Sequence, residues 1–164
     1  MATETIFGSR MSRWIAGFYW GLLVLLGVIF LGLPLLATDM PQFVAVILVT
    51  TFVLIALLFV FILHRAYGMR FTVTRDEVII RGIFNTSRVQ RSEIKSLEKV
   101  PIPFGFRLGG ASLLGGWYYL PGIGTAWVSM TNFSDGVMIT TKKGKHYVIT
   151  PKNPMEFIKK AKQA

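Results

Sequence analysis

Few residues of this 164-residue chain have the type and spacing that catalysis or metal binding requires. The chain contains no cysteine, which excludes disulfides, thiolate metal sites and thiol nucleophiles. Its two histidines, His64 and His146, are far apart, and no carboxylate pair, histidine cluster or nucleophile with a nearby base has a recognisable spacing. His64 follows a long apolar run at an expected helix C-terminus, where a cation is favourable. His146 alternates with Tyr147 on an expected strand and is expected to face solvent. The sequence therefore predicts no catalytic, metal or cofactor site.

A glycine-rich stretch from Gly105 to Gly116 invites comparison with phosphate-binding loops. The pattern Gly-x-x-x-x-Gly-Lys-Ser/Thr is absent, and so is Gly-x-Gly-x-x-Gly between a strand and a helix. We therefore expect these glycines to form turns and bulges of a twisted sheet, and no small-molecule substrate is evident.

Basic residues offer a different chemistry, which is the binding of anions. The formal net charge is +10, and the region from His64 onward contains the whole excess. Nucleic acid is not expected as a partner, because aromatic and basic residues are not interleaved as in a known module. Anionic lipid attracts such cations by about 1 kcal/mol each near a membrane surface, although a solvated basic surface is the simpler alternative. The candidate lipid contacts are Arg70, Arg75, Lys142, Lys143 and Lys145.

Four aromatic residues form a second candidate surface, for a peptide or subunit partner. They are Trp117, Tyr118, Tyr119 and Trp127, which lie on two expected neighbouring strands. Successive side chains of a strand point to opposite faces, so Tyr118 and Tyr119 cannot both be buried in one core. At least one of them is expected to be exposed, covered at an edge, or in contact with a partner.

Two apolar runs precede the region that contains both candidate surfaces. Residues 14–36 and 43–63 contain no charged residue, and the polar segment 37–42 separates them. A hydrocarbon core of about 30 Å needs about 20 helical residues, so both runs are long enough to cross a bilayer. We expect a transmembrane helical hairpin over residues 14–63. A cleaved signal peptide is the alternative for the first run, but that run is longer than a typical signal and has Leu35 where a small residue is needed near Ala37.

Charges beside the two runs predict the orientation of the hairpin. Arg10 and Arg13 precede the first run, Arg65 and Arg70 follow the second, and the segment between the runs contains only Asp39. The positive-inside rule then places both termini in the cytoplasm, including the N-terminal segment 1–13, and makes the chain a multi-pass protein of the cytoplasmic membrane.

The hairpin itself lacks the residues of a transporter or channel. Neither run contains an ionisable residue, so the sequence predicts no proton relay or ion site within the bilayer. Gly17 and Gly21 form a small-x-x-x-small pair that allows close helix approach. This pair is a candidate homodimer face, and packing against the second helix of the same chain is the alternative.

Alternating apolar residues after the hairpin predict a cytoplasmic domain over residues 69–164. Regular structure is expected to break at Pro101, Pro103, Gly105 and the pair Gly109–Gly110. Residues 92–97 are expected to form a helical turn or a bent strand. Strands followed by one amphipathic helix indicate an α+β fold. Antiparallel strands are expected at 69–74, 77–81, 86–91, 116–120, 125–130, 136–141 and 145–150, and a helix after Asn153, with Phe157, Ile158 and Ala161 toward the sheet.

This region resembles the bacterial families of pleckstrin homology (PH) domains that are fused to transmembrane helices. The resemblance covers about Met69 to Lys162, and its most characteristic stretch is Tyr147–Ile158, in which a strand, a Thr-Pro-Lys-Asn-Pro corner and a helix follow one another. It implies a curved, barrel-like antiparallel sheet with a C-terminal helix, and a membrane-anchored adaptor or regulatory module. Further matching residues are Phe71, Val73, Val78–Ile80, Ile94, Arg107–Gly110, Gly116–Trp117, Gly122–Gly124 and Val137–Ile139.

Two classes of function remain open. The first is a non-enzymatic membrane protein whose PH-like domain binds protein partners, a second copy of itself, or anionic lipid at the cytoplasmic face. The second is an accessory subunit of a larger membrane enzyme or transport complex, in which another chain carries the chemistry. Fold alone does not decide between them.

Overall fold

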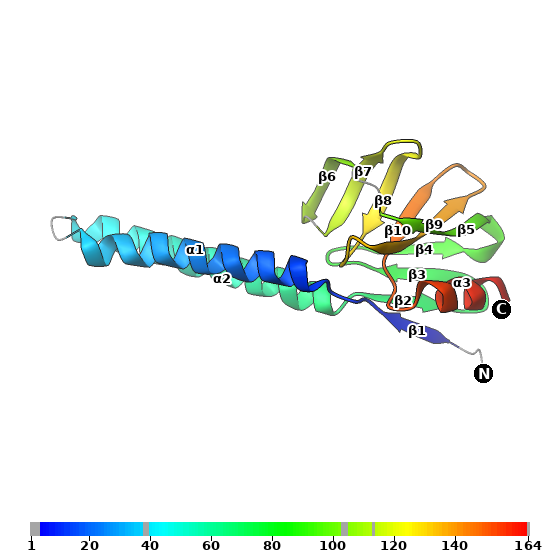
Figure 1. Ribbon diagram of the computed structural model, residues 1–164, viewed down its shortest axis with the longest axis horizontal. Coiled ribbons are helices and arrows are strands. Elements are labelled where there is room, and N and C mark those ends of the chain that lie inside the picture. The colour runs from blue at the N-terminus through cyan, green and yellow to red at the C-terminus, as the bar shows by residue number, and fades with distance from the viewer. Residues whose placement is uncertain (1–3, 38–39, 103–104, 113, 164) are drawn as a thin grey trace. The chain divides into compact units, whose positions relative to one another are not determined.

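The structure is a computed structural model that describes residues 4–37, 40–102, 105–112 and 114–163 (Figure 1). It divides into two compact units: Arg13–His64, and the two segments on either side of that stretch taken together. The predicted outer turn at Asp39 lies outside the described residues.

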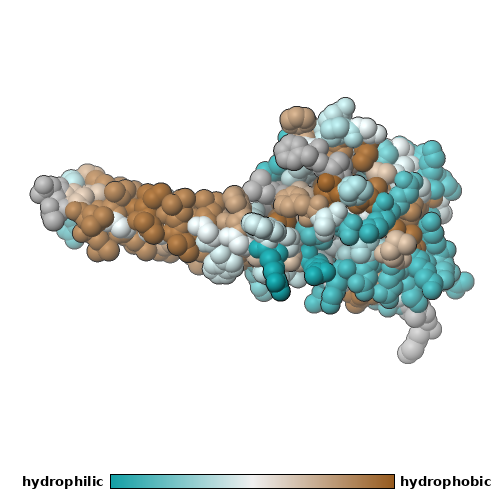
Figure 2. Space-filling model, in the orientation of Figure 1, coloured by the Kyte–Doolittle hydropathy of each residue, from teal (hydrophilic) through white to brown (hydrophobic). Residues whose placement is uncertain are grey.

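The first unit consists of two long helices. Helix α1 is Arg13–Leu36, and α2 begins at Gln42 and ends at Tyr67, so its last turn belongs to the second unit. At about 1.5 Å per residue they are about 36 and 39 Å long, and both are long and apolar enough to cross a membrane. On the face drawn in Figure 2, most of the surface of the two helices is hydrophobic. The predicted helices are confirmed, and α2 extends one residue before and four residues beyond its apolar run.

Aromatic side chains join α1 to α2. The rings of Tyr19 and Phe59 meet edge to face with their centroids 5.5 Å apart. Further along α1, a Cβ atom at Gly27 would lie 3.3 Å from the ring of Phe52. Residue numbers rise along one helix as they fall along the other, so the two helices pack as an antiparallel hairpin.

The second unit contains two sheets and the C-terminal helix α3, Pro154–Gln163. The four-stranded sheet has the order β1-β2-β3-β4, and all its pairs are antiparallel: β1 Thr5–Gly8, β2 Arg70–Val73, β3 Glu77–Arg81 and β4 Thr86–Gln90. A 3-10 turn at Arg91–Glu93 leads to the six-stranded sheet, of order β5-β9-β10-β8-β7-β6. Its strands are β5 Ile94–Pro101, β6 Phe106–Ser112, β7 Gly115–Leu120, β8 Gly124–Ser129, β9 Asp135–Thr141 and β10 His146–Ile149.

The α+β architecture is confirmed, with four differences from the sequence-based expectation. Neither sheet closes into a barrel, and β10 pairs with β8 in parallel rather than antiparallel fashion. Strand β6 lies where prolines and glycines predicted irregular structure, because the breakers before it end at Gly105 and its own glycines are accommodated by bulges. Strand β1 had not been predicted at all.

The main core lies between the two sheets and α3. Phe71 and Ile80 from the four-stranded sheet, Ile139 from the six-stranded sheet and Phe157 from α3 are fully buried in one cluster. Phe7 on β1 joins this cluster, with its ring 5.3 Å from that of Phe157. The predicted inward face of α3 is confirmed, since Phe157 and Ala161 are buried and Ile158 packs partly against the same core.

The domain begins before the helical hairpin, because β1 pairs with β2 from the far side of it. All four residues of β1 are in register with β2, from Thr5 opposite Val73 to Gly8 opposite Arg70. The chain then stays on the domain up to α1: the Lys152 amide donates to the carbonyl oxygen of Gly8 at 2.9 Å, and the Ser12 amide donates to that of Thr131 at 2.7 Å. The hairpin is therefore inserted between the first two strands of one folded unit.

Candidate functional site

An exposed aromatic face extends over β6 and β7. The side chains of β7 alternate: Tyr118 is buried, with 8% of its surface exposed, whereas Trp117 is 43% and Tyr119 48% exposed. Opposite Tyr119 on β6 lies Phe106, which is 67% exposed. Leu108 of β6 is exposed as well. We call Phe106, Leu108, Trp117 and Tyr119 the aromatic face.

This face is the uncovered continuation of the main core. Ile139, Tyr147, Trp127 and Trp117 stand opposite one another on four successive strands, so they share one side of the six-stranded sheet. Ile139 is fully buried, Tyr147 and Trp127 are partly buried, and Trp117 is exposed and meets Trp127 edge to face at 5.3 Å. The other sheet and α3 thus cover one half of this side and leave the aromatic half open.

Of the four predicted aromatic contacts, two are exposed. Tyr118 belongs instead to a second core on the opposite side of the sheet, with Leu120, Val128 and Val148. Burial raises the pKa of the Tyr118 hydroxyl, and the nearby charge of Arg107 partly offsets the rise. Sequence reasoning missed Phe106 and Leu108, although their spacing of two residues was a signal for a strand.

The pairing of β6 with β7 contains two register shifts and a close approach of glycine backbones. The register shifts between Arg107 and Gly109 and again between Gly109 and Ser112, which confirms the predicted bulges. Gly116 on β7 has a φ of +147°, and a Cβ atom there would overlap the carbonyl oxygen of Gly109. Only glycine permits this approach, and bulges protect the free edge of β6 from pairing with another strand.

The structure does not bring all five predicted lipid contacts together. Arg70 begins β2, directly after the segment that leaves α2, whereas Arg75 lies in the turn at the other end of β2. Lys142, Lys143 and Lys145 lie in the turn between β9 and β10. That turn is at the far end of β9, about 20 Å from its first residue at about 3.3 Å per residue. We call the end with Arg70 the junction end and the other the distal end.

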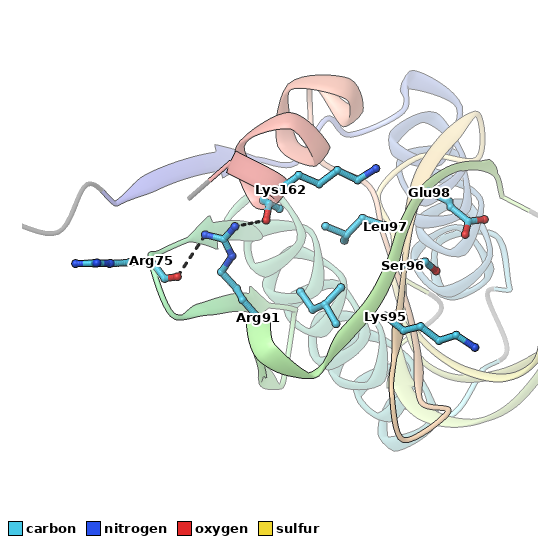
Figure 3. A pocket seen from close by; sticks show the side chains of 9 residues that line it. Arg75, Arg91, Lys95, Ser96, Leu97, Glu98 and Lys162 are labelled. Carbon is cyan, nitrogen blue, oxygen red and sulfur yellow. Dashed lines mark hydrogen bonds between the residues drawn. The ribbon is translucent and has the colours of Figure 1, made fainter.

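A groove of about 530 Å³ lies at the distal end, where Arg75, Lys95, Glu98 and Lys162 line it (Figure 3). Arg91 also reaches it, but its guanidinium donates hydrogen bonds to the carbonyl oxygens of Thr74 and Arg75, both at 3.3 Å, and to that of Ala161. Arg91 therefore ties the β2–β3 turn to the end of α3. The Arg75 side chain points away from the other lining residues in Figure 3, so these cations do not converge on one point.

One of the distal lysines is paired. Lys143 Nζ lies 2.6 Å from Glu93 Oε1, and both side chains are in solvent. This hydrogen bond and the attraction of opposite charges lower the pKa of the Glu93 carboxyl and raise that of the Lys143 ammonium. Lys142 and Lys145 are exposed on either side of the pair.

The histidines do not assemble a site. His64 is exposed near the end of α2, and His146, expected to face solvent, is partly buried with Nδ1 3.2 Å from Thr140 Oγ1. Within residues 4–37, 40–102, 105–112 and 114–163, no three His, Asp or Glu side chains are grouped as metal ligands would be.

Comparison with known families matches residues 69–164 to the bacterial PH domain. That span is more than half of the chain. The chain belongs to the bacterial PH domain family. No curated protein and no solved structure matches it. The predicted resemblance is therefore confirmed, and the family suggests a binding or adaptor module rather than an enzyme.

The matched PH domain does not include everything that completes the fold. Strand β1 and helices α1 and α2 precede residue 69, yet β1 supplies one edge of the four-stranded sheet and Phe7 enters the core. The PH domain of this chain is thus completed by a strand from the other side of the hairpin.

The glycine pair of α1 lies apart from the contact between the two helices. A Cβ atom at Gly17 or Gly21 would have no described heavy atom within 4 Å, unlike one at Gly27. Gly27, rather than this pair, is the glycine that lies against α2. A homodimer contact at Gly17 and Gly21 stays a prediction.

Proposed function

We propose that this chain is a membrane-anchored, non-enzymatic binding module. Helices α1 and α2 span the cytoplasmic membrane, and the PH domain lies at the cytoplasmic face and binds a protein partner. The observation that carries the proposal is the insertion of the hairpin between β1 and β2. Since these strands pair in one domain, both ends of the hairpin must leave the bilayer on the same side.

Flanking charge supports the cytoplasmic side. Arg10, Arg13, Arg65 and Arg70 lie within a few residues of the two helix ends that join the domain. Basic residues beside a span favour the cytoplasm.

The aromatic face supports a protein as the partner. Phe106, Trp117 and Tyr119 are exposed on neighbouring strands and continue a core. Aromatic side chains are enriched at the centres of protein interfaces, where they bury a large area at a low cost in conformational entropy. The distal cations, Arg75, Lys142 and Lys145, would favour a partner with an acidic rim.

Site-specific photo-crosslinking in intact cells tests this proposal. A photoreactive amino acid at Tyr119 should give a discrete adduct with one protein, and the same adduct should form from position 106. Position 155 is the matched control, because Met155 is an exposed apolar residue on α3, away from β6 and β7. Equal adducts at 119 and 155, or none at 119 and 106, would refute the aromatic face as the binding surface.

A further inference from the structure

The junction end of the PH domain contains two loops that are bonded to the chain on either side of the hairpin. Arg65, in the last turn of α2, donates from Nε to the carbonyl oxygen of Ile83 at 2.9 Å. This carbonyl belongs to the β3–β4 loop, residues 82–85. The Thr131 hydroxyl donates to the carbonyl oxygen of Arg10 at 3.2 Å, three residues before α1. Thr131 is the second residue of the β8–β9 turn, residues 130–134.

Each of these two loops presents an exposed phenylalanine. Phe84 is 48% exposed although its neighbour Ile83 is buried, and Phe133 is 59% exposed. The β8–β9 turn is closed by Asn132, whose Oδ1 accepts hydrogen bonds from the amides of Ser134 and Asp135. Its conformation is thus fixed by polar bonds, and the ring of Phe133 is left outside the core.

Arginines accompany the phenylalanines. Arg70 and Arg81 stand directly opposite each other on β2 and β3, and both are exposed. Like charges in such a cross-strand pair destabilise a sheet, and a bound anion beside them would offset their repulsion. Asp135, an acidic residue at this end, already pairs with Lys99 at 3.2 Å. The junction end therefore combines apolar loop tips with an arginine pair.

We infer that the junction end docks onto the anionic headgroup surface of the bilayer that the hairpin spans. Phe84 and Phe133 enter the interfacial region, while Arg70 and Arg81 bind lipid phosphate groups. This inference rests on the proposed membrane insertion of α1 and α2. Arginine forms paired hydrogen bonds to phosphate, and apolar burial combined with anionic attraction is how peripheral elements hold to membranes.

Connection to the membrane favours this surface over the distal end. Only Gly68 and Met69 separate the end of α2 from the start of β2, and Met69 is itself buried in the domain. The loop with Phe84 is hydrogen-bonded to Arg65 in the last turn of α2. The turn with Phe133 is hydrogen-bonded to Arg10, three residues before α1. The lysines at 142, 143 and 145 lie about 20 Å further along β9.

Fluorescent labelling of single cysteines in the full chain tests the inference, because the natural chain has no cysteine. An environment-sensitive probe is attached at Phe84→Cys, Phe133→Cys or, as the distal control, Lys143→Cys. The chain is reconstituted into phosphatidylcholine vesicles with about a quarter phosphatidylglycerol, and quenching is measured with lipids that carry a nitroxide just below the headgroup. Where a phenylalanine variant does not fold, Asn85→Cys or Ser134→Cys replaces it.

We expect the probes at 84 and 133 to be quenched several-fold more by the lipid nitroxide than the probe at 143, and less by aqueous iodide. Quenching that is equal at all three positions would overturn the inference. If carbonate extracted the chain from the vesicles, the proposed membrane anchor would fail as well; if the chain stayed integrated while 84 and 133 remained in water, only this inference would fail.

The arginine pair is tested in the same vesicles. In a chain whose only substitution is Phe133→Cys, lipid quenching of the probe at 133 should fall when phosphatidylglycerol is omitted. Arg70→Gln with Arg81→Gln should remove most of that dependence, whereas the charge-matched control, Lys142→Gln with Lys145→Gln, should leave it unchanged. An anion dependence that survived the arginine substitutions, or that disappeared equally in the control, would overturn the assignment of Arg70 and Arg81.

Discussion

Single side chains decide which parts of this PH domain are fixed and which remain available for binding. Arg91 is fixed, because it donates to three carbonyl oxygens from the β2–β3 turn and α3. Lys143 is paired with Glu93, while its neighbours Lys142 and Lys145 are exposed. Charge counted from the sequence therefore overstates the cations available to a ligand at the distal end.

The Glu93–Lys143 pair gives a prediction at this scale. The pKa of Glu93 is lower in the folded chain than in the unfolded chain. The contribution of Glu93 to stability is therefore present at pH values above its unfolded-state pKa, and it is lost as the pH falls through its folded-state pKa. The pKa of Lys143 is higher in the folded chain, so its contribution to stability is present below the unfolded-state pKa of lysine and is lost as the pH rises through the folded-state pKa. Lys143→Ala should therefore raise the titration midpoint of Glu93 toward 4.5, measured by carbon NMR of glutamate carboxyls in the detergent-solubilised chain.

Lys142→Ala is the control for this titration. Lys142 contacts Glu93 through its backbone amide, which donates to the Glu93 carbonyl oxygen at 2.7 Å, and alanine retains that bond. The midpoint should not move in this variant. An unchanged midpoint in Lys143→Ala would contradict the ion pair.

Among the elements, β6 and β7 matter most for the proposed function, because they present the aromatic face. Strand β6 is an edge strand, bonded only to β7 within the described sheet. Its position depends on the close approach of Gly109 and Gly116. Rigid placement of exposed aromatic residues on strands lowers the conformational cost of binding.

Gly116→Ala should therefore destabilise the domain. A side chain at φ +147° is strained, and the added Cβ would overlap backbone, so we expect a loss of at least about 2 kcal/mol of unfolding free energy. Gly109→Ala is the control, because a Cβ there meets no described heavy atom within 4 Å. Denaturant unfolding of the solubilised chain, followed by near-ultraviolet circular dichroism, measures both. Equal unfolding midpoints for the two variants would contradict the bulged pairing.

At the scale of the whole molecule, the hairpin is an insertion in the domain rather than an anchor attached to one end. The four residues of β1 pair with β2, and the chain from Ser9 to Ser12 is hydrogen-bonded to the domain at Met69 and Thr131. Both ends of the hairpin are thus tied to one folded unit.

Local patterns predicted the long elements well. The run from residue 14 to 36 predicted α1 to within one residue, and Lys142-Lys143-Gly144 predicted the β9–β10 turn, where Gly144 has the expected positive φ of 76°. The end of α2 was placed four residues early, because apolar composition marks the length suited to a bilayer and does not mark where helical hydrogen bonding ends.

Features that depend on contacts between distant parts of the chain could not be predicted from local sequence patterns. Strand β1 is only four residues long, and its partner lies beyond the whole hairpin, so no nearby pattern indicated it. The opposition of Arg70 to Arg81, and the separation of Arg70 from the distal lysines, depend on strand order and register. The alternation rule correctly predicted that Tyr118 and Tyr119 face opposite ways, but which one is buried depends on what packs against each side of the sheet.

The central claim is that β1 and β2 pair across the inserted hairpin, and disulfide formation in membrane vesicles tests it most directly. Ile6→Cys with Thr72→Cys joins two residues that stand opposite each other, and Ile79→Cys with Arg88→Cys, opposite each other on β3 and β4, is the positive control. After mild oxidation of the full chain, we predict that both pairs close to a similar extent and lose reactivity toward maleimide. Closure of the 79–88 pair without closure of the 6–72 pair would contradict the account.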